Sequence, residues 1–482
     1  MNLQNQKYGI PALFIDGEWI SHTARMGEVH NPANGEFLAN FPFAEPAHID
    51  RALSSSLVGF EVWRKMPHEA RCGIMHRAAR LLREKAEDAA RHMTLELGRP
   101  IAESRLEMEN CANLLEWCAT AAGEHHDRAL ADRAGFVAQT VRKEPIGPVA
   151  AFATWNFPAS LATRKMASAL AVGCSVIVKP AEETPCSFTS VVEALDAAGL
   201  PRGVVNLLLG DPAEISRRLI TSPVIRKIAF TGSTPVGKQL AALAGSEAKP
   251  CVMELGGHAA VVVFEDADID RAIALSVTTK SRNAGQVCIS PTRYLVQEGA
   301  HKRFATGFAN AFSALRLGDG FDPETEMGPL LSQRRLEAVD ALVQDAVAQG
   351  AHLLTGGTRL NRPGNFYAPT VLVDVPDEAR IMREEPFGPV AVINRFSDLA
   401  DAVTKANSTD FALAAYAFTG SQKTAEQVAD ALDAGMVGIN GYGVVFLDSP
   451  LGGRRQSGFG SEGGYEGLDA YRIVKFISQA IA

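Results

Sequence analysis

The feature that most constrains the fold is a regular alternation of short apolar runs and helix-like segments that begins at Val149. We expect strands at Val149–Trp155, Ser175–Lys179, Val204–Leu209 and Lys227–Thr231, and helices at Ala159–Val172, Ser187–Ala198, Pro212–Thr221 and Val236–Ala244. Repetition at this spacing predicts a parallel sheet with helices on both faces. Because such sheets bind ligands beyond the carboxyl ends of their strands, the residues that follow each strand are candidate binding residues.

A second alternation begins after Gly257, and a chain of 482 residues is too long for one core. We expect strands at Ala259–Phe264, near Val371–Val375, Val390–Phe396 and Ala414–Thr419, and helices at Asp268–Arg282, His301–Leu315, Ser332–Gln349, Asp398–Ala406 and Thr424–Ala434. The second half of the chain therefore predicts a second α/β domain.

The N-terminal part has a different pattern. Up to about Glu45 the sequence is typical of strands and turns, and from Ala47 to His126 it is typical of long amphipathic helices. The clearest predicted helix is Arg71–Leu97, with Gly98 as its stop. The isolated extended segment Phe136–Glu144 predicts an edge strand or a pairing site for another subunit, and the tail offers a similar segment at Tyr471–Phe476.

Composition excludes several classes of protein. The net charge is −8 without a long basic run, which argues against nucleic acid and anionic membranes as partners. No window approaches the ~20 apolar residues of a membrane span, and the first residues lack the pattern of a signal peptide. Seven cysteines without paired spacing favour a reducing cytoplasm. Eleven histidines form no metal-binding motif, so no metal site is expected.

Cys288 is the candidate nucleophile. It lies between Gly285 and Pro291, after a helix-like segment, so its thiol is held at a chain reversal with backbone N–H groups nearby. Most single cysteines are small buried apolar residues, and Cys111, Cys118 and Cys174 fit that interpretation because of their helical or strand surroundings. The neighbours of Cys288 favour a reactive thiol instead.

Two further polar residues are candidate catalytic groups. Asn156 precedes Phe157–Pro158, where it could cap the next helix or donate its amide to an oxyanion. Glu254 stands beside Gly256–Gly257; in an apolar setting its pKa would be raised, which suits a general base. An ordinary surface glutamate is the alternative.

Candidate cofactor residues follow two other strands. Gly232–Lys238 matches the first seven positions of a P-loop, but Gln239 replaces the magnesium-binding hydroxyl, so a nucleotide triphosphatase or kinase is disfavoured. The segment could place N–H groups near a phosphate, or it could be an ordinary tight turn. Lys179 and Glu182 could bind ribose hydroxyls or form a surface ion pair. A carboxylate at Glu182 would repel a 2′-phosphate, which favours NAD over NADP.

Together these motifs resemble the aldehyde dehydrogenase superfamily over essentially the full chain, and most closely the NAD(P)-dependent succinate-semialdehyde dehydrogenases. The matching segments are Trp155–Pro158, Lys179–Pro185, Phe230–Gly237, Glu254–Gly257, Gly285–Cys288, Glu384–Pro389 and Pro450–Gly458. They occur in the order and spacing of that superfamily.

The resemblance implies a domain plan. A Rossmann-like NAD-binding domain would comprise residues 1–122 and 146–256, and a catalytic domain residues 257–449. Residues 123–145 and 450–482 would form an oligomerisation arm and tail. The expected assembly is a homodimer or homotetramer.

The resemblance also implies roles for individual residues. Cys288 would attack the aldehyde, Asn156 and the Cys288 N–H would hold the oxyanion, and Glu254 would activate water to hydrolyse the thioester. The implied cofactor is NAD, with NADP as the alternative. The implied cofactor-binding residues are Thr154, Trp155, Lys179, Glu182, Gly210, Gly232, Ser233, Gly237, Glu385 and Phe387.

The substrate is less constrained. Arg164 and Arg282 resemble two arginines that grip the distal carboxylate in succinate-semialdehyde dehydrogenases, although either could form a structural ion pair. Phe446 lies in an apolar loop, which favours a larger hydrophobic or aromatic aldehyde as the alternative. An acylating enzyme that uses coenzyme A is disfavoured by Glu254. A catalytically silent relative is disfavoured because Cys288 and Glu254 are both present.

Overall fold

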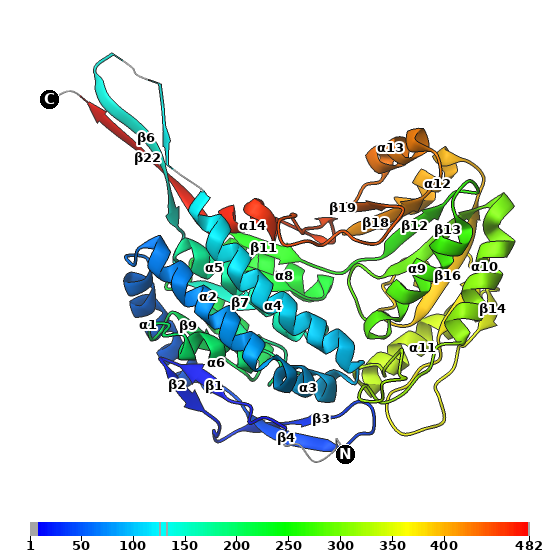
Figure 1. Cartoon of the computed structure of the whole chain (residues 1–482), viewed down its shortest axis with the longest axis horizontal. Helices are drawn as coiled ribbons and strands as arrows, with labels where there is room; N and C mark the ends of the chain where they lie inside the picture. Colours follow the sequence, from blue (N-terminus) through cyan, green and yellow to red (C-terminus); the bar gives the residue numbers. More distant parts are fainter. Residues whose placement is uncertain (1–7, 125–126, 132–133, 481–482) are drawn as a thin grey trace.

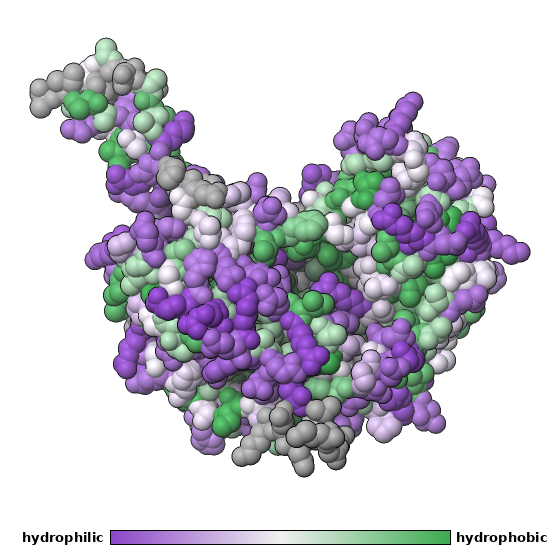
Figure 2. Space-filling model, in the orientation of Figure 1, coloured by the Kyte–Doolittle hydropathy of each residue, from purple (hydrophilic) through white to green (hydrophobic). Residues whose placement is uncertain are grey.

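The computed structural model describes residues 8–124, 127–131 and 134–480. The sequence-predicted end of the helical region at His126 and the last two residues of the tail lie outside the described residues, as do residues 1–7. Figure 1 shows two α/β lobes and an arm that projects from the first lobe. Figure 2 shows the same division on the molecular surface. The α/β fold class predicted from the alternation is confirmed.

The first lobe is built on an eight-stranded sheet with the order β2-β1-β9-β8-β7-β10-β11-β21. Its central strands β9, β8, β7, β10 and β11 are parallel, and the strands at both edges are antiparallel. The strands are β1 (Leu13–Ile15), β2 (Glu18–Ile20), β7 (Val149–Phe152), β8 (Val176–Lys179), β9 (Val205–Leu207), β10 (Lys227–Thr231), β11 (Cys251–Glu254) and β21 (Gly458–Phe459).

Helices cover both faces of this sheet. Val149 and Ala151 of β7 join one core, whereas Ala150 and Phe152 join another, as the two-residue period of a strand requires. The first core includes α2 (His68–Glu84), α3 (Ala86–Leu97), α4 (Ile101–Ala121), α5 (Pro158–Val172) and α6 (Thr189–Ala197). The second includes α1 (Pro46–Trp63), α7 (Pro212–Thr221) and α8 (Thr234–Ser246).

The second lobe is built on a seven-stranded sheet with the order β14-β15-β16-β13-β12-β18-β19. Its strands are β12 (Ala259–Val263), β13 (Pro291–Gln297), β14 (His352–Thr355), β15 (Thr370–Val373), β16 (Val390–Phe396), β18 (Ala414–Phe418) and β19 (Met436–Ile439). Its helices are α9 (Ile269–Ser281), α10 (Glu298–Ser313), α11 (Gln333–Ala348), α12 (Leu399–Ala406) and α13 (Gln422–Ala431).

Two local expectations need correction. The single helix predicted for Arg71–Leu97 is wrong, because α2 ends before Lys85, whose N–H bonds back to Leu82 and Arg83 rather than continuing the helix. The new helix α3 then starts with acidic residues, which favour a helix N-terminus. Its stop is confirmed, since Gly98 has the left-handed φ of 72°. In addition, strand β13 was not expected from the sequence, and it opens at Pro291, since the first residue of a strand is one of the few strand positions where proline is tolerated.

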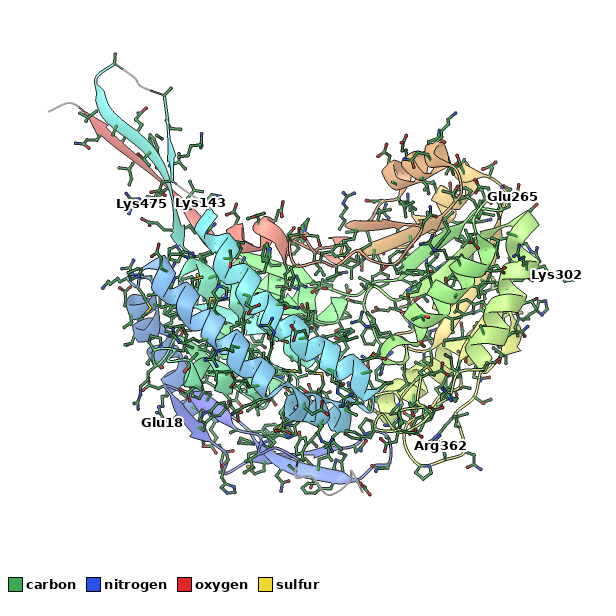
Figure 3. All side chains as sticks on the ribbon, viewed as in Figure 1. Glu18, Lys143, Glu265, Lys302, Arg362 and Lys475 are labelled. Carbon is green, nitrogen blue, oxygen red and sulfur yellow. The ribbon has the colours of Figure 1, made fainter. Side chains whose placement is uncertain are left out.

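The projecting arm is a three-stranded antiparallel sheet of β5 (Arg128–Ala129), β6 (Phe136–Pro145) and β22 (Arg472–Ala480). The two extended segments predicted from sequence are thus paired with each other. Lys475 pairs with Glu144 at 3.4 Å, and Figure 3 shows Lys475 near Lys143 where the arm leaves the lobe. Among the described residues, no helix is long and apolar enough to cross a membrane.

The remaining short elements pack around the lobes. They are β3 (Met26–His30), β4 (Phe37–Pro42), β17 (Phe411–Ala412), β20 (Arg454–Arg455), α14 (Gly464–Asp469) and three turns of 3-10 helix at Ala122–Glu124, Arg282–Gly285 and Arg380–Met382. Strand β21 lies within the range 450–482 that the sequence assigns to the tail, yet it pairs with β11 at the edge of the first sheet. The domain boundaries themselves stay a prediction.

Candidate active site

Cys288 follows a sharply reversed turn after α9. Asn283, Ala284 and Gly285 all have left-handed φ values, of 46°, 53° and 73°. A Cβ at Gly285 would lie 2.2 Å from the Gly388 carbonyl oxygen, so the close approach requires glycine. Within the described residues no acceptor takes the Cys288 backbone N–H, which leaves it available to an oxyanion.

Glu254 lies beside the thiol. The sulfur of Cys288 is 3.7 Å from Glu254 Oε1. Glu254 ends strand β11, and Gly257 then lets the two segments meet, because a Cβ there would lie 2.1 Å from the Cys288 carbonyl oxygen. Residues 34 positions apart in the sequence are thus brought into contact.

The Glu254 carboxyl and the Cys288 thiol both have raised pKa values. Burial raises the pKa of Glu254, and repulsion from Glu462 raises it further. Burial also raises the pKa of the Cys288 thiol well above its ordinary value, with further contributions from Glu254 and Glu385. A raised carboxyl pKa is the property predicted for a general base at this position.

A buried polar chain supports Glu254 from behind. Thr231 Oγ1 donates to Glu254 Oε2 at 2.9 Å, and Lys165 Nζ in turn donates to Thr231 Oγ1. Lys165 also forms an ion pair with Glu462 at 2.7 Å, and both side chains are almost completely buried. This chain holds one carboxylate oxygen of Glu254 and leaves the other facing Cys288. Sequence reasoning did not assign these roles to Thr231, Lys165 and Glu462.

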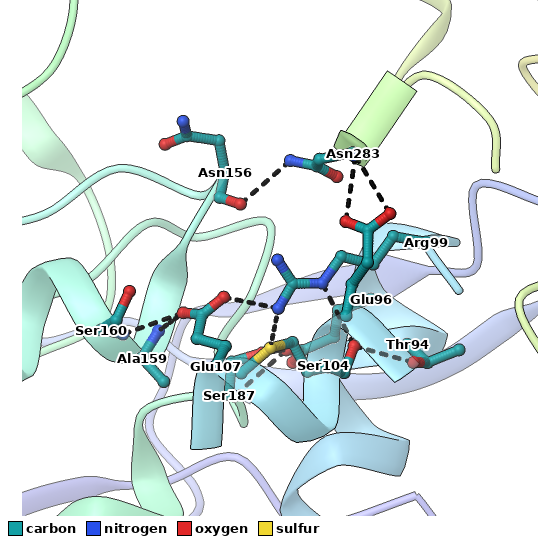
Figure 4. A network of polar contacts seen from close by, with 12 residues as sticks. Thr94, Glu96, Arg99, Ser104, Glu107, Asn156, Ala159, Ser160, Ser187 and Asn283 are labelled. Atoms are coloured by element: carbon teal, nitrogen blue, oxygen red, sulfur yellow. Dashed lines mark hydrogen bonds and ion pairs between the residues drawn. The ribbon is translucent and has the colours of Figure 1, made fainter. Parts of the chain in front are cut away.

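Asn156 is not a helix cap. The N-cap of α5 is Phe157, which makes no side-chain capping bond. Asn156 is buried instead, and its Nδ2 donates to the Gln286 carbonyl at 3.1 Å, two residues before Cys288. An amide NH₂ group has two hydrogens, so one stays available for an oxyanion. The Asn283 amide donates to the Asn156 carbonyl at 3.0 Å, as Figure 4 shows.

A cavity of about 510 Å³ opens at Cys288. The predicted site residues in its wall are Thr154, Trp155, Asn156, Gly232, Ser233, Cys288, Glu385 and Phe387. Residues that were not predicted also contribute, and they are Thr231, Thr234, Pro235, Leu255, Gly256, Arg334, Arg335, Arg383, Glu384 and Phe411. The structure therefore gathers eight of the predicted residues around one cavity.

The geometry of this cavity suits a flat ring and a phosphate. The Trp155 and Phe387 rings meet edge to face, with centroids 5.4 Å apart. Ser233 is the N-cap of α8 and makes no side-chain capping bond, so the N–H groups at that helix end can face an anion. Glu385 accepts from the Gly257 N–H at 3.2 Å, and burial raises the pKa of its carboxyl to about 8.

Four predicted cofactor residues lie outside this wall. Lys179 and Glu182 form an ion pair at the end of β8. Gly210 and Gly237 are packing positions, since a Cβ would lie 2.9 Å from Ala44 N and 2.2 Å from a Leu255 methyl, respectively. Contact of these four residues with a cofactor stays a prediction.

A second cavity of about 340 Å³ brings together all three predicted substrate residues, Arg164, Arg282 and Phe446. Its other lining residues are Leu106, Glu107, Asn110, Phe157, Ser160, Val445 and Leu447. Arg164 is 5% exposed, and within the described residues its Nη1 has no hydrogen-bond partner. The guanidinium of Arg282 lies over the Phe157 ring, 4.8 Å from the centroid. The neighbours Asn156 and Phe157 line one cavity each, so the two cavities adjoin.

Comparison with known proteins defines the class. The profile of the aldehyde dehydrogenase family matches residues 19–477, and the chain belongs to this family. The motif resemblance and the enzyme class predicted from it, an aldehyde dehydrogenase, are therefore confirmed.

Three similar proteins place the chain within the family. It is 44% identical to the 4-(hydroxymethyl)benzenesulfonate dehydrogenase TsaD1 of Comamonas testosteroni, over 98% of each chain. It is 38% identical to the NADP(+) succinate-semialdehyde dehydrogenase GabD of Escherichia coli strain K12, over 96% of each chain. The crystal structure of a Staphylococcus aureus betaine aldehyde dehydrogenase with NAD+ superposes with a TM-score of 0.95 at 32% identity, covering 98% of this chain and 95% of that one. The family is thus NAD(P)-dependent.

Proposed function

We propose that this aldehyde dehydrogenase oxidises an aldehyde that carries an anionic group distant from its carbonyl, and releases the carboxylic acid. The observation that supports this most is Arg164, whose buried guanidinium lines the second cavity with one nitrogen unpartnered among the described residues. A buried guanidinium nitrogen without a hydrogen-bond partner is costly, and an anion bound to this guanidinium in the cavity would offset the cost of burying its charge. The named substrates of two relatives carry such a group, a sulfonate and a carboxylate.

The apolar wall of the same cavity favours an aromatic or otherwise large substrate body. Phe157 and Phe446 stand with Leu106, Val445 and Leu447 around the two arginines. Aromatic side chains offer large apolar surfaces on which another ring can stack. The two substrate alternatives left open by the sequence therefore combine into one: a ring or chain on the apolar wall, with a sulfonate or carboxylate against Arg164.

The chemistry starts at Cys288. Its sulfur bonds to the carbonyl carbon while its proton passes to Glu254, whose Oε1 is 3.7 Å away. The carbonyl oxygen becomes an oxyanion, and the free hydrogen of the Asn156 amide and the Cys288 N–H are its donors. NAD(P)+, when bound, supplies the acceptor for the hydride that leaves this carbon.

Cys288 then carries the acyl group as a thioester. Glu254 first loses the Cys288 proton to solvent and then removes a proton from water; the water oxygen bonds to the acyl carbon, and the carbon–sulfur bond breaks to release the acid and the thiolate. The chain of Thr231 and Lys165 behind Glu254 keeps its carboxylate oriented for this step. The presence of this polar chain behind Glu254 supports hydrolysis of the thioester over acyl transfer to coenzyme A. The same polar chain disfavours a catalytically silent protein.

The residues of the large cavity fit the cofactor of the family. Trp155, Glu385 and Phe387 would flank the nicotinamide half of the cofactor. Gly232 and Ser233 would face the pyrophosphate, and Lys179 and Glu182 would bind the adenosine ribose. We propose NAD as the preferred form, because the Glu182 carboxylate would repel the 2′-phosphate of NADP.

The test is NADH formation over matched aldehydes, with succinate semialdehyde, 4-carboxybenzaldehyde and 4-sulfobenzaldehyde as anionic substrates and benzaldehyde and butanal as neutral ones. Arg164→Ala should raise KM for the anionic aldehydes by about tenfold to 100-fold, as expected for a lost charge-assisted hydrogen bond. KM for the neutral ones should change by less than about threefold. Arg105→Ala is the control, because Arg105 is an exposed arginine paired with Glu87 on the surface. Equal effects of Arg164→Ala on both substrate sets would refute the proposal.

We also propose that the arm joins subunits into a homodimer or homotetramer in the cytoplasm. Val137, Val474 and Phe476 on the arm are 61%, 69% and 54% exposed, which is unusual for such large apolar residues. All seven cysteines are free, as expected in a reducing compartment. Light scattering should give a multiple of the 51.5 kDa chain mass, and Phe476→Glu should lower it. A monomeric wild-type protein would contradict the assembly.

A further inference from the structure

Helix α4 carries two carboxylates one turn apart, Glu103 and Glu107, near its N-terminal end. Figure 1 shows α4 running across the first lobe toward the second, and Ile101 N donates to the Gly320 carbonyl of the second lobe at 2.9 Å. Glu107 is only 4% exposed. Both carboxylates thus lie where the two lobes meet.

Glu107 supplies the cap that α5 lacks. Its Oε1 accepts from the backbone N–H groups of Ala159 and Ser160, at 2.9 and 2.8 Å. These belong to the first turn of α5, whose own N-cap, Phe157, has no side-chain acceptor. Asn156 immediately precedes the N-cap residue Phe157. The Glu107 carboxylate therefore fixes the end of α5 from which Asn156 reaches the site.

Glu103 fixes the other side. Its two oxygens accept from the Asn283 N–H, at 3.0 and 3.3 Å. Asn283 is the first left-handed residue of the turn that leads to Cys288, and such a conformation costs roughly 1 kcal/mol or more for a residue other than glycine. The Asn283 side chain then donates to the Asn156 and Gln286 carbonyls, at 3.0 and 3.3 Å.

Arg99 holds the Glu107 carboxylate in place. Arg99 is 1% exposed; its Nη2 pairs with Glu107 Oε2, and its Nε donates to Ser104 Oγ at 3.1 Å. Figure 4 shows Glu107 between Arg99 on one side and the Ala159–Ser160 backbone on the other. Both Glu107 oxygens are therefore engaged by the protein, although the residue lines the second cavity.

We propose that Glu103 and Glu107 are positioning residues that hold the Asn156 amide in register with the Cys288 turn. The inference rests on the proposed roles of Asn156 and Cys288. Asn156 follows a strand of the first sheet, and Asn283 precedes a strand of the second, so the distance between them depends on the packing of two lobes. One helix that binds the backbone on both sides sets that distance directly. Neither carboxylate touches the reacting atoms.

The test compares Glu103→Gln, Glu103→Ala, Glu107→Gln and Glu107→Ala with Glu109→Gln. Glu109 lies on the same helix but is half exposed and pairs with Arg83 at the surface. Each alanine variant should lower kcat by about tenfold to 100-fold, as expected for misplacement of a catalytic group by up to about 1 Å. Glutamine keeps one acceptor oxygen and should restore part of the loss. The control should match the wild type.

A second readout separates positioning from general damage. Alkylation of Cys288 by iodoacetamide, followed at its own peptide by mass spectrometry, forms no oxyanion and therefore does not use Asn156. In the variants its rate should stay within about twofold of the wild type while kcat falls. If the alanine variants do not fold, the glutamine variants carry the test, since they preserve side-chain size.

Either of two outcomes would overturn the inference. One is an unchanged kcat in folded α4 variants, and the other is alkylation of Cys288 that slows in parallel with kcat in these variants. The proposed function is tested separately by Asn156→Ala and Cys288→Ser. If those two variants abolish oxidation and the α4 variants do not affect it, only the positioning role fails. If oxidation persists in Cys288→Ser, the proposed mechanism itself fails.

Discussion

Replacing Gly257 by alanine should disable the site while adding a single methyl group. The new Cβ would lie 2.1 Å from the Cys288 carbonyl oxygen and 3.3 Å from the Leu413 Cβ. An ordinary contact between a carbon and an oxygen is more than 3 Å, so the Cys288 segment must move away by roughly 1 Å. The backbone opposite is not the end of a flexible side chain, so the displacement cannot be absorbed by a rotamer change.

The magnitude follows from the geometry. Glu254 acts on the thiol proton and on the attacking water, and Asn156 and the Cys288 N–H act on the oxygen of the carbonyl group that is bonded to the Cys288 sulfur. A displacement of about 1 Å costs a catalytic site about 100-fold in rate. We therefore expect kcat to fall by about two orders of magnitude, which equals about 2.7 kcal/mol of transition-state stabilisation. KM for the aldehyde should change less, because the second cavity is built from other segments.

The assay is steady-state NADH formation, with thermal melting as the measure of folding. Gly245→Ala is the matched control, since a Cβ at Gly245 would have no atom within 4 Å and Gly245 lies inside helix α8. That variant should be as active as the wild type and slightly more stable, by about 0.5–1 kcal/mol. Activity of Gly257→Ala within twofold of the wild type would refute the argument that this contact sets the position of Cys288.

Three further outcomes are expected. Glu254→Gln should abolish steady turnover and also slow the first round of NADH formation, because Glu254 both accepts the Cys288 proton and activates water; a first turnover at the wild-type rate would remove Glu254 from the proton-transfer step. The wild-type kcat should rise with pH above the range in which an ordinary carboxyl group titrates, because the raised pKa of Glu254 means that its basic form is lost as pH falls through that pKa; a flat pH profile would contradict it. Glu182→Gln should raise kcat/KM with NADP by about tenfold relative to NAD, because Lys179 loses its carboxylate partner and no charge repels the 2′-phosphate; an unchanged cofactor ratio would remove Glu182 from that role.

The sequence predicts this fold well where the signal is local. Strands β10 and β16 and helix α7 match the expected ranges residue for residue, because each is a short apolar run or an amphipathic helix bounded by turn residues. Eight predicted site residues line one cavity: five follow β7 or β10, at the carboxyl edge of the first sheet, and Cys288, Glu385 and Phe387 precede strands of the second sheet. Local motifs therefore predicted residues that the fold brings together, and their catalytic and binding roles stay predictions.

The features that the sequence did not predict are those without a local sequence signal. Strands β13 and β19 were not predicted, although β13 lies at the centre of its sheet, because their boundaries depend on pairing with β12, β16 and β18. The break at Lys85 likewise carries no glycine or proline that would mark it. Lys165 and Glu462 are 297 positions apart, so nothing local to either residue predicts that they pair behind Glu254.

The same reasoning explains why the catalytic geometry depends on residues outside the Asn156 and Cys288 motifs. Asn156 belongs to one sheet and Cys288 to the other, so neither motif can fix the distance between them. Besides the direct bonds of the Asn156 and Asn283 side chains, the distance is held by groups that reach both segments: Glu103 and Glu107 on α4, which bind the backbone of both turns, and Gly257, which lets the Cys288 carbonyl approach β11. Substitutions at these positions should therefore lower kcat by about tenfold to 100-fold, although none of these residues bonds to the reacting carbonyl group.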